Sequence, residues 1–201
     1  MRNISVKVFD DGKKPVYEGF GELLFTHFGL SGPTVLSASA HMRDMAPGRY
    51  TVELDLKPAL TPEQLDQRLL RDLEKNKNKN FSNALDELLP QKMIPVIIKR
   101  SGIPPEEKCH TVTRIQRAAL LEALKHFTVD ISGFAPLAGA IVTAGGVRVK
   151  EIDPKTMQSK IIPGLFFAGE IMDVDAYTGG FNLQIAFSTG YLAGKNAAEN
   201  Y

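Results

Sequence analysis

A block of helical periodicity interrupts the chain and constrains its fold more than any other feature. Four leucines recur at helical spacing between residues 65 and 73, directly after a helix start at Thr61. Thr113 and Gln116 have the spacing of a capping box, which begins a further helix. Residues 58–127 are therefore predicted to form a small helical domain. Two more helices are expected inside it, over 85–89 and 93–99.

Alternating strand patterns lie on both sides of the helical block. Apolar and polar residues alternate over 4–8 and again over 50–56, and alternation returns from residue 128 onward. Neither flank alone offers enough strands for an independent core. We therefore expect 1–57 and 128–162 to share one sheet or barrel, into which the helical domain is inserted.

The charge balance of the 201 residues argues against two classes of partner. Lys and Arg number 24 against 23 Asp and Glu, a net charge of +1, so neither nucleic acid nor an anionic membrane surface is an expected partner. The Lys–Asn tract 75–80 is interpreted as a solvated turn. Cys109 is the single cysteine, which excludes an intrachain disulfide and favours a reducing, cytoplasmic compartment.

The densest candidate for chemistry lies between residues 164 and 194. A short apolar run, 165–168, has the pattern of a strand buried on both faces, and Glu170 follows its end. Paired glycines, Gly179 and Gly180, then precede a predicted helix from Asn182. Such glycines let a ligand approach the backbone, and the first-turn amides favour negative charge. The pattern fits a nucleotide-cofactor site and, equally, an ordinary strand-to-helix connection.

Three further positions attract a chemical interpretation. His27 follows an apolar strand and is a candidate proton donor, although a structural histidine is the commoner role. Tyr177 lies in the loop before the paired glycines, where it can contact a ligand or pack against the loop. Cys109 and His110 are adjacent and have no spaced partner pair, which argues against a metal site.

Several motifs together resemble a family of bacterial flavoproteins. The family is called BaiN-like, YhiN-like or aminoacetone-oxidase-like NAD(P)/FAD-dependent oxidoreductases. The order and approximate spacing of the matching stretches agree along the whole chain. They are 21–33, 142–147, 151–157, 163–170, 173–175 and 177–184.

The resemblance implies an α+β fold with three parts. They are a barrel-like β-rich domain (1–57 and 128–162), the inserted helical domain (58–127) and a C-terminal strand–helix segment (163–201) of a glutathione-reductase-like FAD-binding domain. Family members begin with a Rossmann-type FAD domain carrying G-x-G-x-x-G. The only near-match here, at 19–24, opens no predicted helix, so the chain resembles only the later half of a family member.

The resemblance also implies the cofactor and its contacts. Gly169 and Glu170 match the strand end that meets the ribityl chain of FAD. Gly180, Phe181, Asn182 and Leu183 match the helix start whose amides face the flavin pyrimidine edge. There a helix N-terminus would favour negative charge on the reduced ring. The small residues 143–146 are expected beside the flavin, and no metal is expected.

The implied function is electron transfer between FAD and a small organic substrate or NAD(P)H. One alternative is an amine-type flavin oxidase. The other is a substrate-cap or interaction module that is inactive when isolated. Because the adenosine-binding half is not recognised in this sequence, the isolated chain is expected to bind FAD weakly or not at all. The apolar segment 163–201 is expected to be covered by a second copy of the chain, as a homodimer, with repacking on its own β-domain or poor order as the alternatives. No catalytic residue is assigned.

Overall fold

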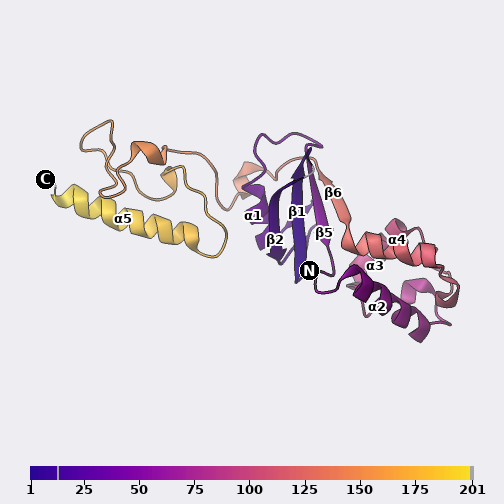
Figure 1. The fold of residues 1–201 in the computed structure, drawn as a ribbon. Coiled ribbons are helices and arrows are strands. Elements are labelled where there is room, and N and C mark those ends of the chain that lie inside the picture. The colour runs from indigo at the N-terminus through magenta and orange to yellow at the C-terminus, as the bar shows by residue number, and fades with distance from the viewer. Residues whose placement is uncertain (13, 200–201) are drawn as a thin grey trace. The chain divides into compact units, whose positions relative to one another are not determined.

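The structure is a computed structural model that describes residues 1–12 and 14–199 (Figure 1). The chain forms two compact units. The first comprises Met1–Thr34 and Asp44–Ser132, and the second comprises Val35–Arg43 and the chain from Gly133. Each unit has buried apolar residues of its own.

The first unit contains an open antiparallel sheet of four strands in the order β2-β1-β5-β6 (Figure 1). The sheet follows the predicted alternation, because Ile4, Val6 and Val8 of β1 are all buried while the residues between them are partly exposed. The strands are β1 (Ile4–Asp10), β2 (Pro15–Gly21), β5 (Tyr50–Asp55) and β6 (Phe127–Ile131).

In the described residues the shared β-structure is an open sheet, not the barrel that the sequence analysis gave as the other form. β2 and β6 are the two edges of the sheet and do not pair with each other. Four strands of five to seven residues give too little sheet to close on itself. Of the flank 128–162, only the part up to Ile131 joins the sheet, and the chain from Gly133 belongs to the second unit.

A small hairpin and a short helix follow β2. The hairpin consists of β3 (Leu24–Phe25) and β4 (Leu30–Ser31), and α1 spans Pro33–Ser39. The G-x-G-x-x-G near-match at 19–24 therefore runs from β2 to the hairpin, with no helix after its glycines. This segment lacks the strand-to-helix turn that a phosphate-binding loop needs.

The block between β5 and β6 is helical, as its leucine spacing predicts. It contains α2 (Pro62–Lys75), α3 (Ile94–Ser101) and α4 (Arg114–Lys125). Capping boxes start both α2 and α4, at Thr61 and Thr113. Residues 85–89 form turns instead of the predicted helix. Three short 3-10 helices complete the block: Phe81–Asn83, Gln91–Met93 and Cys109–Thr111.

The helices pack on leucine and isoleucine side chains. Leu65 and Leu69 of α2, Ile97 of α3, and Leu120 of α4 are each at most 1% exposed. Arg117 of α4 also pairs with Asp66 of α2, with Nε 2.6 Å from Oδ1. The apolar faces of the three helices therefore share one core, and an ion pair at its margin holds α4 against α2.

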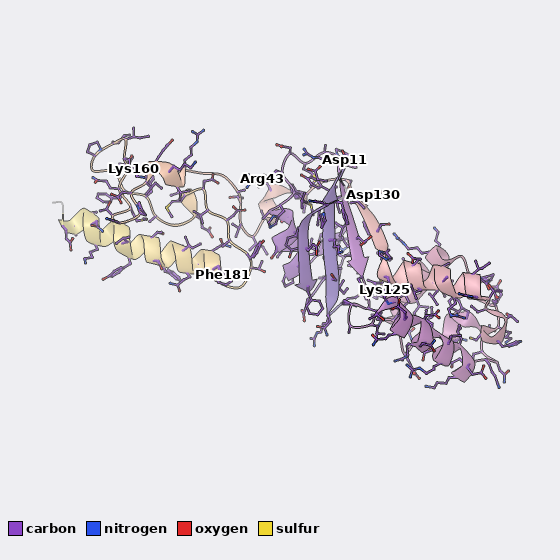
Figure 2. All side chains as sticks on the ribbon, viewed as in Figure 1. Asp11, Arg43, Lys125, Asp130, Lys160 and Phe181 are labelled. Atoms are coloured by element: carbon purple, nitrogen blue, oxygen red, sulfur yellow. The ribbon has the colours of Figure 1, made fainter. Side chains whose placement is uncertain are left out.

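Both ends of the helical block lie beside the ends of β5 and β6, where Figure 2 labels Lys125. We call this junction, formed by Asp55, Leu56, Leu60, Leu124 and Lys125, the neck. The Leu56 amide donates to the Leu124 carbonyl at 2.9 Å. Lys125, whose side chain is 10% exposed, lies 2.5 Å from Asp55 Oδ2 and donates to the carbonyl of Leu60 at 2.8 Å. One ammonium group thus joins the end of α4 to the end of β5 and to the segment that leads into α2.

The second unit has one long helix, α5 (Phe181–Glu199), packed against irregular chain. Its short 3-10 helices are Leu137–Gly139, Val149–Glu151 and Gly169–Ile171. The predicted strand over 165–168 is absent from the described chain and is represented only by an isolated bridge between Gln158 and Phe166. An apolar run forms a buried strand only when neighbouring strands flank it, and this unit contains isolated bridges alone.

No helix of the described residues is long and apolar enough to cross a membrane.

Replacing Lys125 by Met should lower the free energy of unfolding by about 2–4 kcal/mol, because Asp55 and the Leu60 carbonyl lose their donor at a partly buried place. Lys92→Met is the control, since the Lys92 side chain is exposed and makes no hydrogen bond within the described chain, and it should change stability by less than about 0.5 kcal/mol. Urea unfolding followed by circular dichroism measures both. Equal effects would contradict the role assigned to the neck.

Candidate functional site

Two glycines turn the chain into α5 and leave the start of the helix open. Gly179 and Gly180 have φ angles of 121° and 91°, a region that side chains other than glycine rarely adopt. Within the described residues, the amides of Phe181, Asn182 and Leu183 donate to no acceptor, and the first bond of the helix runs from the Gln184 amide to the Gly180 carbonyl at 3.0 Å. Three free donors therefore face outward at a helix N-terminus, where negative charge is favoured.

Asn182 fixes the loop that precedes these glycines. Its Oδ1 accepts from the Ala176 amide at 2.8 Å, and its Nδ2 donates to the Ala176 carbonyl at 2.9 Å. Both hydrogen-bonding groups of the side chain are thus used within the protein. Phe181 and Leu183 beside it are each 59% exposed, and Figure 2 shows Phe181 at one end of α5.

Gly169 and Glu170 lie farther along the same helix. Gly169 has a φ of 74°, and its amide donates to Thr189 Oγ1 of α5 at 3.0 Å. Thr189 is eight residues beyond Phe181, about 12 Å along the axis. Glu170 is exposed, and its carboxylate makes no hydrogen bond or ion pair within the described chain. The structure thus places both groups of predicted residues on α5 or beside it, about two turns apart.

The glycine-rich stretch 143–146 is tied to the chain just after Glu170. The Val147 amide donates to the Ile171 carbonyl at 2.8 Å, and the Asp173 amide donates back to the Val147 carbonyl at 2.9 Å. A Cβ at Gly146 would lie 2.4 Å from the Ile171 carbonyl oxygen. Gly146 is therefore required for close approach of two backbones, a structural role that accounts for it without a ligand.

A histidine that the sequence analysis did not single out lies beside Tyr177. His41 Nε2 is 2.8 Å from the Tyr177 hydroxyl, and the ring centroids are 5.8 Å apart. The two residues are 136 positions apart in the sequence, and both belong to the second unit. No spacing rule connects positions so far apart, so only the fold reveals the pair.

The other chemical candidates have structural surroundings. His27 is exposed and its ring contacts the edge of Phe28. Cys109 is buried, and desolvation raises the pKa of its thiol, which makes it a poor nucleophile. His110 Nδ1 is 2.8 Å from the Lys77 carbonyl oxygen. The described residues contain no group of three His, Cys, Asp or Glu side chains that could hold a metal ion.

The variant Gly146→Ala should destabilise the second unit by about 1–3 kcal/mol, because the new methyl group forces the Ile171 carbonyl away. Gly194→Ala, in the middle of α5 with no atom within 4 Å of the added carbon, should instead stabilise the helix by up to about 1 kcal/mol. Thermal unfolding monitored at a helix band gives both values. A Gly146→Ala protein as stable as the wild type would disprove the close approach.

Comparison with known proteins places these features in a family. The family model described as "HI0933-like protein barrel and H2TH domain" matches residues 1–142. The chain is 33% identical, over 94% of its length, to the 3-dehydro-bile acid delta(4,6)-reductase of Clostridium scindens, and the match covers 46% of that protein.

Two ribosomal RNA dihydrouridine synthases have a similar percentage identity to this chain. The protein of Escherichia coli is 33% identical over 87% of this chain and 42% of its own length. The protein of Haemophilus influenzae is 32% identical over 86% of this chain and 41% of its own. The chain thus spans less than half the length of these curated relatives. The matched family model and the reductase relative together show that the chain belongs to the HI0933-like, or BaiN-like, family of flavoproteins.

Proposed function

We propose that the chain is the substrate-side and flavin-contacting part of an FAD-dependent reductase that saturates a carbon–carbon double bond conjugated with a carbonyl group. The observation that carries the proposal is the likeness, over 94% of the chain, to a protein named a delta(4,6)-reductase. The open helix start at Phe181, behind the Gly179–Gly180 turn, supports the same assignment.

The names of the relatives suggest a common reaction. A delta(4,6)-reductase acting on a 3-dehydro compound removes double bonds conjugated with the 3-ketone. A dihydrouridine synthase adds two hydrogens across the ring double bond of uridine, which is conjugated with a ring carbonyl. Both reactions consume a hydride and a proton. This shared chemistry favours a reductase over the amine-type oxidase, the alternative enzyme.

The residues at the start of α5 fit one edge of a flavin. The three unpartnered amides of Phe181, Asn182 and Leu183 are donors of the kind that the N1 and C2 carbonyl edge accepts, and the helix dipole favours the negative charge of a reduced ring. Gly180 has no atom within 4 Å of the position where a Cβ would lie, so the backbone there can be approached closely. When bound, FAD would supply the hydride transfer, with NAD(P)H as the proposed electron donor.

Gly169 and Glu170 complete the proposed cofactor contact. The exposed Glu170 carboxylate can accept hydrogen bonds from the ribityl hydroxyls, while the Thr189 hydroxyl holds the Gly169 backbone in place. The adenosine and pyrophosphate contacts would come from a glutathione-reductase-like domain with a G-x-G-x-x-G turn. Within the whole protein we propose that 163–201 completes that domain, 58–127 is an inserted domain, and 1–57 with 128–162 forms the β-rich remainder.

A small organic molecule is the proposed substrate, in a cytoplasmic setting. The net charge of +1 offers little attraction for a polyanion. Acidic partners also occupy the lysines that begin the tract 75–80, since Lys75 pairs with Glu87 at 2.6 Å and Lys77 with Glu74 at 3.4 Å. An RNA substrate, as the names of two relatives suggest for those proteins, is the alternative that the experiment distinguishes.

Titration with FAD tests the cofactor assignment. The 201-residue chain alone should form no stoichiometric yellow complex at micromolar concentration, because about 8 kcal/mol is needed and half a site rarely supplies it. Adding the part of the Clostridium scindens relative that the chain does not cover should produce one, whereas bovine albumin should not. If no yellow complex forms when the remaining part of the relative is added, the proposal is contradicted. Tight FAD binding by the chain alone would refute the shared site.

The loaded protein then decides the substrate class. With NAD(P)H, a conjugated steroid ketone should be reduced with matching nicotinamide consumption, and a uridine-containing ribosomal RNA fragment should not. Reduction of the RNA fragment, without reduction of the steroid ketone, would show that the substrate is RNA and not a small molecule.

A further inference from the structure

Saturation of a conjugated double bond needs an acid as well as a hydride, and this inference rests on the proposed reductase function. When a hydride adds to one carbon, the electron pair of the double bond moves to the other carbon and its conjugated carbonyl. A proton must then reach that second carbon. Of the predicted contacts, Glu170 is acceptor-only when ionised, and Phe181 and Leu183 have no side-chain proton to give. Within the second unit, a proton donor would have to be another side chain.

Tyr177 is the weak acid nearest the proposed flavin edge along the chain. It precedes Gly180 by three residues, and its side chain is 51% exposed. Asn182 of α5 holds the adjacent Ala176 through two hydrogen bonds, so the start of the helix fixes the backbone that carries the phenol. The backbone that carries the phenol is therefore hydrogen-bonded to the start of α5, where the open amides lie.

His41 gives the phenol a partner suited to proton transfer. Its Nε2 lies 2.8 Å from the Tyr177 hydroxyl oxygen, within the range for proton transfer between a hydroxyl and a ring nitrogen. Imidazole both accepts and donates protons near neutral pH. An ordinary structural contact would be served equally well by an amide, and this difference makes the role of the ring testable.

We propose that Tyr177 is the proton donor of the reduction and that His41 is the positioning residue that restores its proton. Reduced FAD, when bound, would supply the two electrons as a hydride to one carbon of the double bond. The Tyr177 O–H bond breaks as a C–H bond forms at the second carbon, so the alkene gains two hydrogens. The protonated His41 ring then gives its Nε2 proton to the phenolate, and water returns a proton to the ring.

Three variants separate this role from a structural one. Tyr177→Phe keeps the ring and removes the acid. His41→Gln keeps a hydrogen-bonding group but cannot relay a proton. Tyr191→Phe is the control, because Tyr191 lies exposed on α5 and its hydroxyl makes no hydrogen bond within the described chain. Circular dichroism shows whether each variant keeps the fold.

The two half-reactions of the flavin-loaded whole protein are measured separately. Reduction of the flavin by NAD(P)H should be unchanged in all three variants. Its reoxidation by the conjugated ketone should fall about 10²–10⁴-fold in Tyr177→Phe and at least about 10-fold in His41→Gln, while Tyr191→Phe should match the wild type. In heavy water the wild type should place deuterium on one face of the second carbon, and Tyr177→Phe should place it on both.

A second readout needs no flavin. In the 201-residue chain, nitrogen-15 shifts of the His41 ring report its tautomer and its hydrogen bond. They should change in Tyr177→Phe and stay constant in Tyr191→Phe. An unchanged His41 spectrum in Tyr177→Phe would overturn the pairing.

The outcomes that contradict the inference differ from those that contradict the proposed function. Wild-type reoxidation rate and one-faced deuterium in Tyr177→Phe would overturn the donor role alone. Wild-type behaviour of His41→Gln would overturn the relay. A wild-type protein that NAD(P)H reduces but no conjugated ketone reoxidises would overturn the proposed function, and this inference with it.

Discussion

The neck at Lys125 is the constraint on which the first unit depends. An insertion of this length between two paired strands is compatible with the sheet only if both of its ends return to the same place. Leu54 of β5 lies opposite Phe127 of β6 in the register, so the helical block leaves and re-enters the sheet at neighbouring positions. The ammonium of Lys125 closes this point by contacting Asp55 and the Leu60 carbonyl. The helices can then form their own core without disturbing the strand pairing.

The sequence predicts those parts of the fold whose signals are local. The element β1 is identified by the alternation of Ile4, Val6 and Val8, and α2 by the leucine spacing around Leu65. In both cases the residues of the buried face follow one another at a short, regular spacing in the sequence. Whether the sheet stays open or closes into a barrel could not be predicted, since this depends on how many strands pair across long distances. The run from Leu165 failed for a related reason: an apolar stretch becomes a strand only beside other strands, and here Leu165 remains 38% exposed.

The candidate site divides in the same way. The paired glycines and the start of α5 could be predicted because few residues other than glycine adopt positive φ angles. Gly179 and Gly180 both have them in the structure. The roles of individual side chains were harder to predict from the sequence. The side-chain amide of Asn182 is hydrogen-bonded to the backbone of Ala176. Gly146 leaves space for the Ile171 carbonyl and not for a ligand. The contact of His41 with Tyr177 joins distant segments, and only the fold brings it to light.

The central claim is that the N-terminus of α5 faces the flavin, and hydrogen–deuterium exchange of the whole protein tests it most directly. Addition of FAD should slow exchange at the amides of Phe181, Asn182 and Leu183, which have no acceptor within the described chain. The corresponding first turn of α2, after Thr61, should exchange at the same rate with and without FAD. Protection elsewhere with none at the start of α5 would contradict the account, because the helix would then not contact the cofactor.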